Sequence, residues 1–179
     1  MSNPQCLNVY LGISKYGVTG CHVVAGSSKR KSLYCNKKGQ PARNITAAEY
    51  RHVRKSTLLP GGARIMAGQG KSSWVFQQDN DPCHRAASSV IEDWNKRKGS
   101  SISLLSWPPN SPDLSPIENV WARVQGEVDA LGCKTFEQYE QAIKEHIKNL
   151  PKSYLKSLFD SMKSRVAEVI RLEGGKTGY

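Results

Sequence analysis

The sequence lacks the features that mark membrane-spanning, secreted and zinc-binding proteins. No apolar run approaches the roughly 18 residues that cross a bilayer. The first residues, MSNPQC, lack the charged and apolar regions of a signal peptide. The five cysteines are scattered, and no two of them form a C-x-x-C pair. We therefore expect reduced cysteines, no zinc site, no membrane partner, and a protein that is nuclear or otherwise intracellular and not secreted.

Acidic residues are absent from the beginning of the chain. The first Asp or Glu is Glu49, and seven basic residues precede it. Over all 179 residues, 26 Lys and Arg face 15 Asp and Glu, which gives a formal net charge of +11 and a pI near 9.6. Because phosphate contacts release counterions and a positive field steers polyanions, this charge on so short a chain favours a nucleic-acid partner. A merely soluble basic surface is the alternative.

Basic residues recur in short clusters, SKRK at 28–31, RHVRK at 51–55 and NKRK at 95–98. Such clusters are typical of phosphate contacts, although an exposed basic face would look the same. The candidate nucleic-acid contacts from these clusters are Lys29, Arg30, Lys31, Lys96, Arg97 and Lys98.

The first part of the chain predicts a hairpin and a helix. Leu7–Ile13 and Val18–Ala25 have the composition of strands on either side of a glycine-bearing turn. Residues 26–45 predict a loop or an irregular third strand. A capping box begins a helix at Thr46 that we expect to run to about Leu59, because Pro60-Gly61-Gly62 follows.

The rest of the chain alternates strands and helices and then becomes helical. Strands are expected at 74–78 and 102–107, with a helix between them that closes at Gly99. A long helix from Ser115 has apolar residues in helical register through Leu131, and two more helices are expected at 136–150 and 152–172. This order predicts one α/β domain, with residues 1–132 as its α/β part and residues 133–179 as a helical extension.

Two carboxylates stand out from this pattern. Asp79 follows the strand in VFQQDNDPCH, at the end of a strand where open α/β sheets bind ligands. Asp79 fits either a turn or a metal site, whereas Asp81 before Pro82 is better explained as a helix cap. Glu118 completes an S-x-x-E capping box with Ser115, yet it also borders the apolar stripe and can point toward the sheet. Two such carboxylates would attract a hard divalent cation.

Taken together, these segments resemble the catalytic domain of mariner-superfamily DDE transposases. The resemblance rests on QDNDP at 78–82 and WPPNSPDLSPIE at 107–118, and it extends to the strand at 9–13 and the ending of the chain. It spans nearly the whole chain, and the second motif is too long to arise readily by chance.

The resemblance implies a ribonuclease H-like mixed sheet flanked by helices, with a helical carboxyl-terminal tail. Asp79 and Glu118 would be the second and third members of an acidic triad that holds two Mg²⁺ (or Mn²⁺) ions. The implied activity is cleavage and transfer of DNA strands in cut-and-paste transposition and integration. The implied partners are transposon ends and target DNA, with a homodimer as a further expectation. His84, which follows Asp81-Pro82 in a setting that the family shares, is a weaker candidate for a phosphate contact.

The chain departs from the family in three ways. Thirty-eight residues separate Asp79 from Glu118, somewhat more than in many members, and the surplus is placed at 95–101. No acidic residue precedes Glu49 to serve as the first catalytic Asp, and the amino-terminal helix-turn-helix region has no counterpart. We therefore interpret the chain as an amino-terminally truncated copy that lacks the first, central strand of the sheet.

This interpretation has structural and functional consequences. Without that strand, three outcomes are possible: the strands at 7–13 and 74–78 close on each other, they take a partner strand from another chain, or the chain is a poorly stable fragment with unpaired strand edges. We expect the third outcome, because unpaired backbone groups are costly to bury. Whether the chain is an enzyme is left open, and we expect it to be catalytically incomplete. The alternative function is a non-catalytic nucleic-acid-binding remnant or co-opted module.

Overall fold

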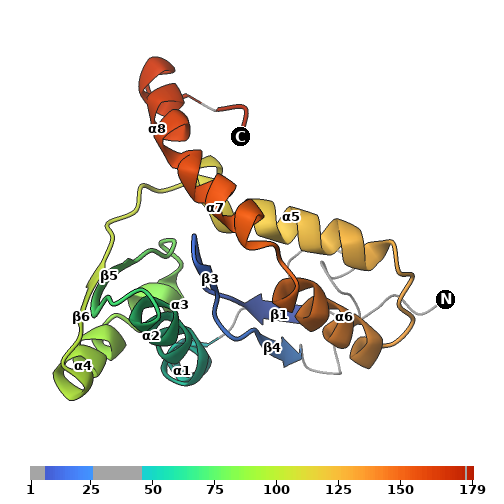
Figure 1. Ribbon diagram of the computed structural model, residues 1–179, viewed down its shortest axis with the longest axis horizontal. Helices are drawn as coiled ribbons and strands as arrows, with labels where there is room; N and C mark the ends of the chain where they lie inside the picture. Colours follow the sequence, from blue (N-terminus) through green and yellow to red (C-terminus); the bar gives the residue numbers. More distant parts are fainter. Residues whose placement is uncertain (1–6, 26–45, 176) are drawn as a thin grey trace.

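A computed structural model describes residues 7–25, 46–175 and 177–179. Figure 1 shows two groups of elements, with β5 and β6 beside α1–α4 on the left and β1 and β4 beneath α5 and α6 on the right. The predicted loop at 26–45, with its basic cluster, lies outside the described residues. Within the described residues no helix is both long and apolar enough to cross a bilayer.

The predicted amino-terminal hairpin is confirmed. β1 (Leu7–Tyr10) pairs antiparallel with β4 (His22–Ala25), and β2 (Ile13–Ser14) pairs antiparallel with β3 (Gly17–Val18). The two ladders are joined at Gly12 and Thr19. The Gly12 amide donates to Thr19 Oγ1 at 2.8 Å, and the Thr19 amide donates to the Gly12 carbonyl at 2.8 Å. The interruption is therefore bridged by hydrogen bonds, and the hairpin is continuous.

The second pair of strands is parallel and is built by a strand-helix-strand connection. β5 (Ser73–Phe76) pairs with β6 (Ser101–Leu104), and the chain between them forms α3 (Pro82–Arg85) and α4 (Ser89–Lys98). α4 ends as predicted at Gly99, whose φ of 58° is left-handed and suits glycine.

The first helical region is longer than predicted. The capping box at Thr46 is confirmed, but the helix does not stop at Pro60-Gly61-Gly62. α1 (Ala47–Val53) continues through a π-helical turn, η1 (Arg54–Leu58), into α2 (Leu59–Ala67). The wider turn removes carbonyls from the regular i+4 pattern, so the missing N–H of Pro60 interrupts no helical ladder.

Close packing explains the two glycines that follow Pro60. A Cβ atom at Gly61 would lie 2.6 Å from Thr19 Cβ, and one at Gly62 would lie 2.1 Å from Cη2 of Trp74. Real Cβ atoms essentially never come so close to other atoms. The glycines therefore let α2 approach both the hairpin and β5, which is a tertiary role that outweighs their low helix propensity.

The last part of the chain is helical. The 3₁₀ turn η2 (Pro112–Leu114) leads into α5 (Pro116–Asp129), and then come α6 (Phe136–Lys148), α7 (Lys152–Asp160) and α8 (Met162–Arg171). The single helix predicted at 152–172 is thus broken at Ser161. Leu131, predicted within the apolar stripe, lies beyond α5 and is 59% exposed.

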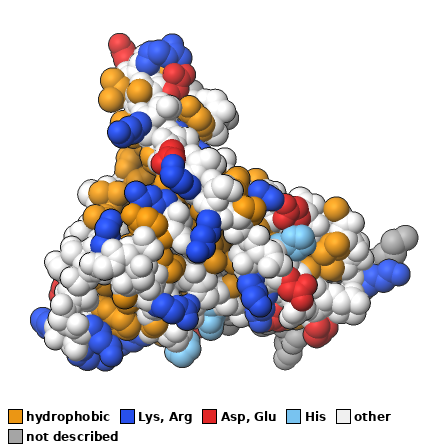
Figure 2. Space-filling model, in the orientation of Figure 1, with side chains coloured by type: hydrophobic (Ala, Val, Ile, Leu, Met, Phe, Trp, Pro, Cys, Tyr) orange, Lys and Arg blue, Asp and Glu red, His pale blue; other side chains and the backbone are white. Residues whose placement is uncertain are grey.

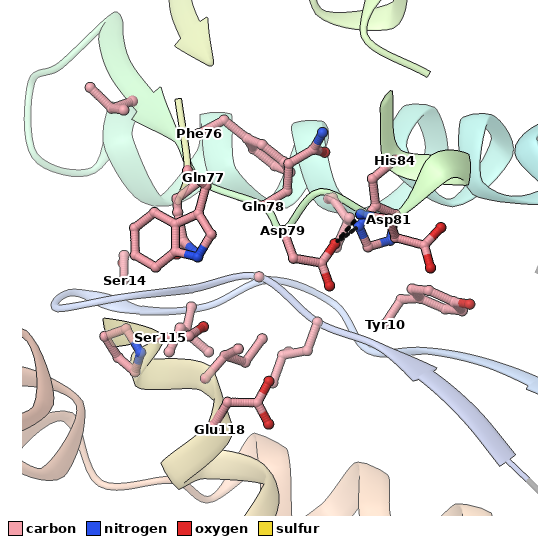
Figure 3. Close-up of a pocket in the computed structure, with 18 of the residues that line it drawn as sticks. Tyr10, Ser14, Phe76, Gln77, Gln78, Asp79, Asp81, His84, Ser115 and Glu118 are labelled. Atoms are coloured by element: carbon pink, nitrogen blue, oxygen red, sulfur yellow. Dashed lines mark hydrogen bonds and ion pairs between the residues drawn. The ribbon is translucent and has the colours of Figure 1, made fainter. Parts of the chain in front are cut away.

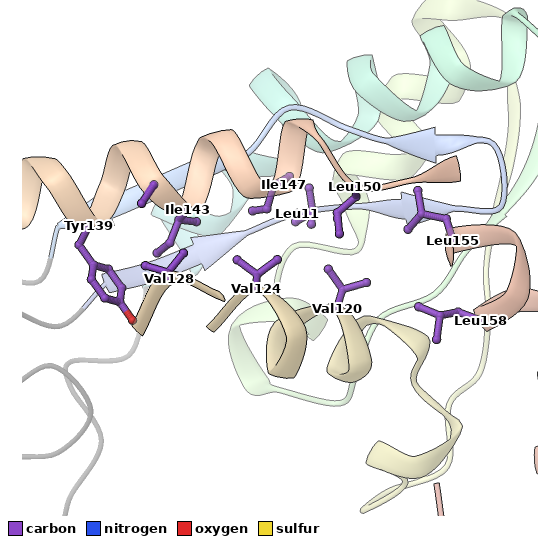
Figure 4. Packing of buried hydrophobic residues seen from close by; sticks show 11 residues of the cluster. Leu11, Val120, Val124, Val128, Tyr139, Ile143, Ile147, Leu150, Leu155 and Leu158 are labelled. Carbon is purple, nitrogen blue, oxygen red and sulfur yellow. The ribbon is translucent and has the colours of Figure 1, made fainter. Parts of the chain in front are cut away.

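The largest apolar cluster joins the hairpin to these helices. Val120, Val124 and Val128 of α5 face Ile143 and Ile147 of α6, and Leu11 of the hairpin packs into the same cluster (Figure 4). This packing fixes α5, and therefore its first turn, relative to β1.

The two pairs of strands do not form one sheet. Within the described residues β1 bonds only to β4, and β5 bonds only to β6. A cavity of about 770 Å³ lies between β1 and β5, and Val75 in the middle of β5 is 61% exposed. Of the three alternatives for these strands, closure on each other is therefore not what the structure shows, because a cavity separates β1 from β5.

Candidate active site

The cavity between the strand pairs brings both predicted carboxylates to one place. Its walls come from the hairpin, from β5 and the residues after it, and from the loop that leads into α5. Figure 3 shows Asp79 on one wall and Glu118 on the facing wall, with both carboxylates turned toward the space between. The segments that carry the two acids are thus far apart in the sequence and close together in the fold.

Asp79 lies just after β5 and is held by the turn that follows. Its Oδ1 atom accepts a hydrogen bond from the Asp81 amide at 3.1 Å and lies 2.5 Å from Nδ1 of His84. Oδ2 has no hydrogen-bond partner among the described residues, and the side chain is 66% exposed. One oxygen therefore orients the carboxylate while the other faces the cavity.

The residues after Asp79 form the predicted helix cap. Asp81 accepts a hydrogen bond from the Cys83 amide at 2.8 Å, and Pro82 occupies the first helical position. Hydrogen bonds from Cys83 lower the pKa of Asp81, which keeps this cap charged. Asp81 is therefore a structural residue, as the sequence indicated.

His84 lies beside Asp79 and also stacks on an aromatic ring. The imidazole and the ring of Tyr50 have centroids 4.1 Å apart and are inclined by 32°. The structure thus places this predicted site residue in contact with a predicted catalytic acid, where it orients Asp79 from the side of α1.

Glu118 lies on the first turn of α5, but it does not form the predicted capping box. The side chain of Ser115 makes no capping hydrogen bond, and the Glu118 amide bonds to the Ser115 carbonyl at 3.1 Å. Within the described residues the Glu118 carboxylate has no hydrogen-bond or ion-pair partner. Loss of water at the cavity wall raises the pKa of Glu118, and repulsion from Asp79 raises it further.

The two carboxylates fit a hard divalent cation. Each offers oxygen atoms free of protein partners, and the repulsion between them would be relieved by positive charge. Among the described residues no cluster of three or more His, Cys, Asp or Glu side chains could hold a metal. The described residues therefore bring two carboxylates to this cavity, and Mg²⁺ is commonly bound by one or two carboxylates with water completing the coordination.

Asn80 connects the two motifs, a role that sequence reasoning missed. Its side-chain Nδ2 donates to the carbonyl of Trp107 at 2.8 Å, so QDN is tied to the start of WPPNSPDLSPIE. The only signal in the sequence was its place next to Asp79. The bond brings the loop before α5 against the strand end.

The predicted basic contacts on α4 do not line the cavity. Lys96, Arg97 and Lys98 are exposed on the last turn of α4, away from the residues that line it. Lys29, Arg30 and Lys31 fall outside the described residues. Figure 2 shows Lys and Arg spread over the visible face, including the region of α4, rather than gathered at one place.

Comparison with known proteins decides the family. The sequence profile of a family described as DDE superfamily endonuclease matches residues 33–142. The chain belongs to this family. This chain is also 34% identical over 130 residues to the Tcb1 transposase of Caenorhabditis briggsae. The match covers 73% of this chain and 45% of the Tcb1 transposase. The chain is 32% identical over 131 residues to the Tc1 transposase of Caenorhabditis elegans, with the same coverage.

The DDE chain therefore spans less than half the length of these curated relatives. Its fold is similar to two solved structures of the Mos1 mariner transposase. A paired end complex with Mn matches with a TM-score of 0.65 and 16% identity, and the match covers 98% of the present chain and 53% of the Mos1 chain. The Mos1 catalytic domain alone matches with a TM-score of 0.58, and the match covers 98% of the present chain and 84% of the Mos1 domain. The predicted family is confirmed, and so is a mixed α/β fold of the ribonuclease H-like kind.

Proposed function

We propose that this chain carries the strand-cleavage and strand-transfer site of a cut-and-paste DNA transposase, with Asp79 and Glu118 as its metal-binding acids. The observation that supports this most directly is that two acids from separate motifs face one cavity, where burial, and then repulsion from Asp79, raises the pKa of Glu118. The relatives are named transposases, and Mos1 was solved with Mn in a paired end complex. DNA, as transposon end and target, is the proposed substrate.

In this proposal some residues of the site bind the metal ion and others orient the metal-binding carboxylates. Oδ2 of Asp79 and the carboxylate of Glu118 would hold Mg²⁺ or Mn²⁺, while His84 and the Asp81 amide keep Asp79 oriented through Oδ1. When bound, such ions activate water or a 3′-hydroxyl and stabilise the leaving oxygen at the scissile phosphate. The protein contributes position and charge rather than covalent chemistry.

We further propose that these 179 residues alone do not complete the reaction, because they supply two carboxylates where the family uses three. No Asp or Glu precedes Glu49 in the sequence. Support for this comes from the sheet, since within the described residues β1 and β5 each have an edge without a strand partner across the cavity. A strand between them would be covered by α2 on one side and α5 on the other, as a central strand is.

Metal binding tests the proposed site. Titration calorimetry with Mn²⁺ should show binding that weakens by at least about tenfold in Asp79→Asn and in Glu118→Gln. Glu127→Gln is the matched control, because it removes an acid from α5 that is engaged with Arg123 at 2.8 Å and does not line the cavity. Equal Mn²⁺ affinity in all four proteins would refute the assignment of the two acids.

A nicking assay on naked DNA with Mg²⁺ or Mn²⁺ tests the proposed incompleteness. We expect no turnover, and turnover that disappears in Asp79→Ala would show that the chain is a complete enzyme. Amide hydrogen exchange tests the incomplete sheet, because successive amides of a strand point to opposite edges. Alternate amides of β1 and β5 should exchange rapidly, and uniform protection along both strands would contradict an open edge.

A second candidate function is DNA binding without catalysis. It is favoured by the net charge of +11 and by the exposed basic residues at 96–98 on α4. It predicts DNA affinity that falls steeply with salt and shows little preference for sequence. DNA affinity that does not change between about 50 and 200 mM salt would exclude this function.

A further inference from the structure

Two arginines are buried without a carboxylate partner. Arg54 in the π-helical turn η1 is 0% exposed, and Arg165 in α8 is 3% exposed. Within the described residues no Asp or Glu lies at ion-pair distance from either guanidinium. Burying a charge is costly unless hydrogen bonds replace the lost water. Both guanidiniums are bound through their terminal nitrogens, although the buried Nε of Arg54 has no hydrogen-bond partner within the described residues.

Arg54 binds the segment that carries Asp79. Its Nη1 donates to the carbonyl of Ala87 at 2.6 Å, and its Nη2 donates to Oε1 of Gln78, the residue immediately before Asp79. The guanidinium carbon also lies 4.9 Å from the centre of the Tyr50 ring and 5.4 Å from that of Phe76. Arg54 therefore links the end of β5 to the turn that follows α3.

Arg165 makes the same pair of contacts with the segment that carries Glu118. Its Nη1 donates to the carbonyl of Asp113 at 2.7 Å, and its Nη2 donates to Oδ1 of Asn119 at 2.8 Å. Asn119 immediately follows Glu118. The Nε atom donates to Ser161 Oγ at 2.9 Å, and the ring of Tyr179 lies 4.9 Å from the guanidinium carbon.

We propose that Arg54 and Arg165 are positioning residues, each of which fixes one acid of the cavity by binding the amide side chain of that acid's chain neighbour. This inference rests on the proposed function, because the acids need to be held in place only if they bind a metal ion. The contacts of the two arginines do not depend on that function. Each guanidinium also binds one backbone carbonyl nearby, that of Ala87 after α3 for Arg54 and that of Asp113 in η2 for Arg165.

Neutral acceptors suit this role. A carboxylate that paired with either arginine would add negative charge near the site, and direct pairing with Asp79 or Glu118 would occupy the oxygens that a cation needs. Amide and carbonyl oxygens bind the guanidinium and leave the charge of the two acids free. The forked donors of Arg reach two acceptors at a fixed angle, which a Lys ammonium on a flexible stem cannot reproduce.

The test compares Arg54→Lys and Arg165→Lys with Val128→Ala. Val128 is 0% exposed near the end of α5 opposite Glu118 and does not line the cavity, so its truncation lowers stability without removing a hydrogen bond from either acid-bearing segment. We expect each arginine variant to weaken Mn²⁺ binding about tenfold at a temperature where all proteins are folded, and Val128→Ala to change it less than about twofold.

Amide NMR shifts supply the readout that a general loss of stability would not produce. Arg54→Lys should move the amide signals of Gln78 and Asp79 and leave those of Glu118 and Asn119 in place, and Arg165→Lys should do the reverse. Should an arginine variant not fold, Gln78→Ala and Asn119→Ala remove the acceptors instead and should give the same two patterns.

Signals that move together in all variants, in proportion to the loss of stability, would overturn the proposal. The same holds if Val128→Ala weakens Mn²⁺ binding as much as the arginine variants do. If the unaltered protein binds no Mn²⁺, the proposed function fails, while the two NMR patterns still decide whether the arginines position the segments.

Discussion

The contact between α2 and β5 yields a quantitative prediction at Gly62. In Gly62→Ala the new Cβ atom would lie 2.1 Å from Cη2 and 2.4 Å from Cζ3 of Trp74. The indole cannot simply withdraw, because it packs against the buried cluster that contains Leu59, Val90 and Ile102. The helix or β5 must therefore shift, and β5 leads directly to Asp79.

The size of the effect follows from two opposing contributions. Inserting a methyl group into a filled space costs about 1–3 kcal/mol, whereas replacing glycine by alanine inside a helix gains about 0.5–1 kcal/mol. The net loss should be about 1–2 kcal/mol in the free energy of unfolding. For a chain of this size each kcal/mol changes the melting temperature by roughly 2–4 °C, so Gly62→Ala should melt roughly 2–8 °C lower.

Urea and thermal unfolding followed by circular dichroism measure this change. Gly126→Ala is the control, since Gly126 lies within α5 and a Cβ there would meet nothing within 4 Å. The control should gain about 0.5–1 kcal/mol from helix propensity alone. If Gly62→Ala were as stable as Gly126→Ala, the close approach of α2 to Trp74 would be wrong.

Two further predictions concern the acids and the helix caps. Asp79→Asn should lower the pKa of Glu118, measured from its carboxyl ¹³C shift, but not to the ordinary value, because partial loss of water is the larger cause. An unchanged pKa of Glu118 in Asp79→Asn would contradict the proximity of the acids. Because folding raises the pKa of Glu118, its contribution to stability is fully present at pH values below the ordinary pKa and is lost as pH rises through the pKa of the folded protein. Thr46→Ala should lower the free energy of unfolding, measured in urea, by about 1 kcal/mol, because it removes a capping box. Ser115→Ala should lower it clearly less, because the Ser115 side chain makes no capping hydrogen bond. Equal losses would disprove the difference between the two helix starts.

Sequence patterns predicted the elements whose stability is local. The hairpin followed from two segments of strand-like composition around a glycine-bearing turn, and α4 followed from its apolar spacing and the stop at Gly99. The continuation of the helix through Pro60-Gly61-Gly62 did not follow, because it depends on contacts with Thr19 and Trp74 that no local pattern contains. Tertiary packing outweighed propensity there.

The candidate site was predicted in part. The motifs identified Asp79 and Glu118, and the structure places both at one cavity. The supports of the site were not predictable in the same way. Arg165 binds Asn119 across 46 positions of the chain, and Arg54 reaches Gln78 across 24. A buried arginine and an exposed one look alike in a sequence, so only the fold reveals these partners.

The unpaired edges of β1 and β5 also bear on how the protein behaves in solution. A strand edge with free amides and carbonyls is a template for other chains, and exposed apolar residues such as Val75 and Leu105, at 61% and 44%, add to that tendency. Mutual repulsion between molecules of charge +11 opposes aggregation, but salt screens it within about 10 Å at 0.1 M. Solubility should therefore decline as ionic strength increases, and more steeply than for a sealed sheet with the same charge.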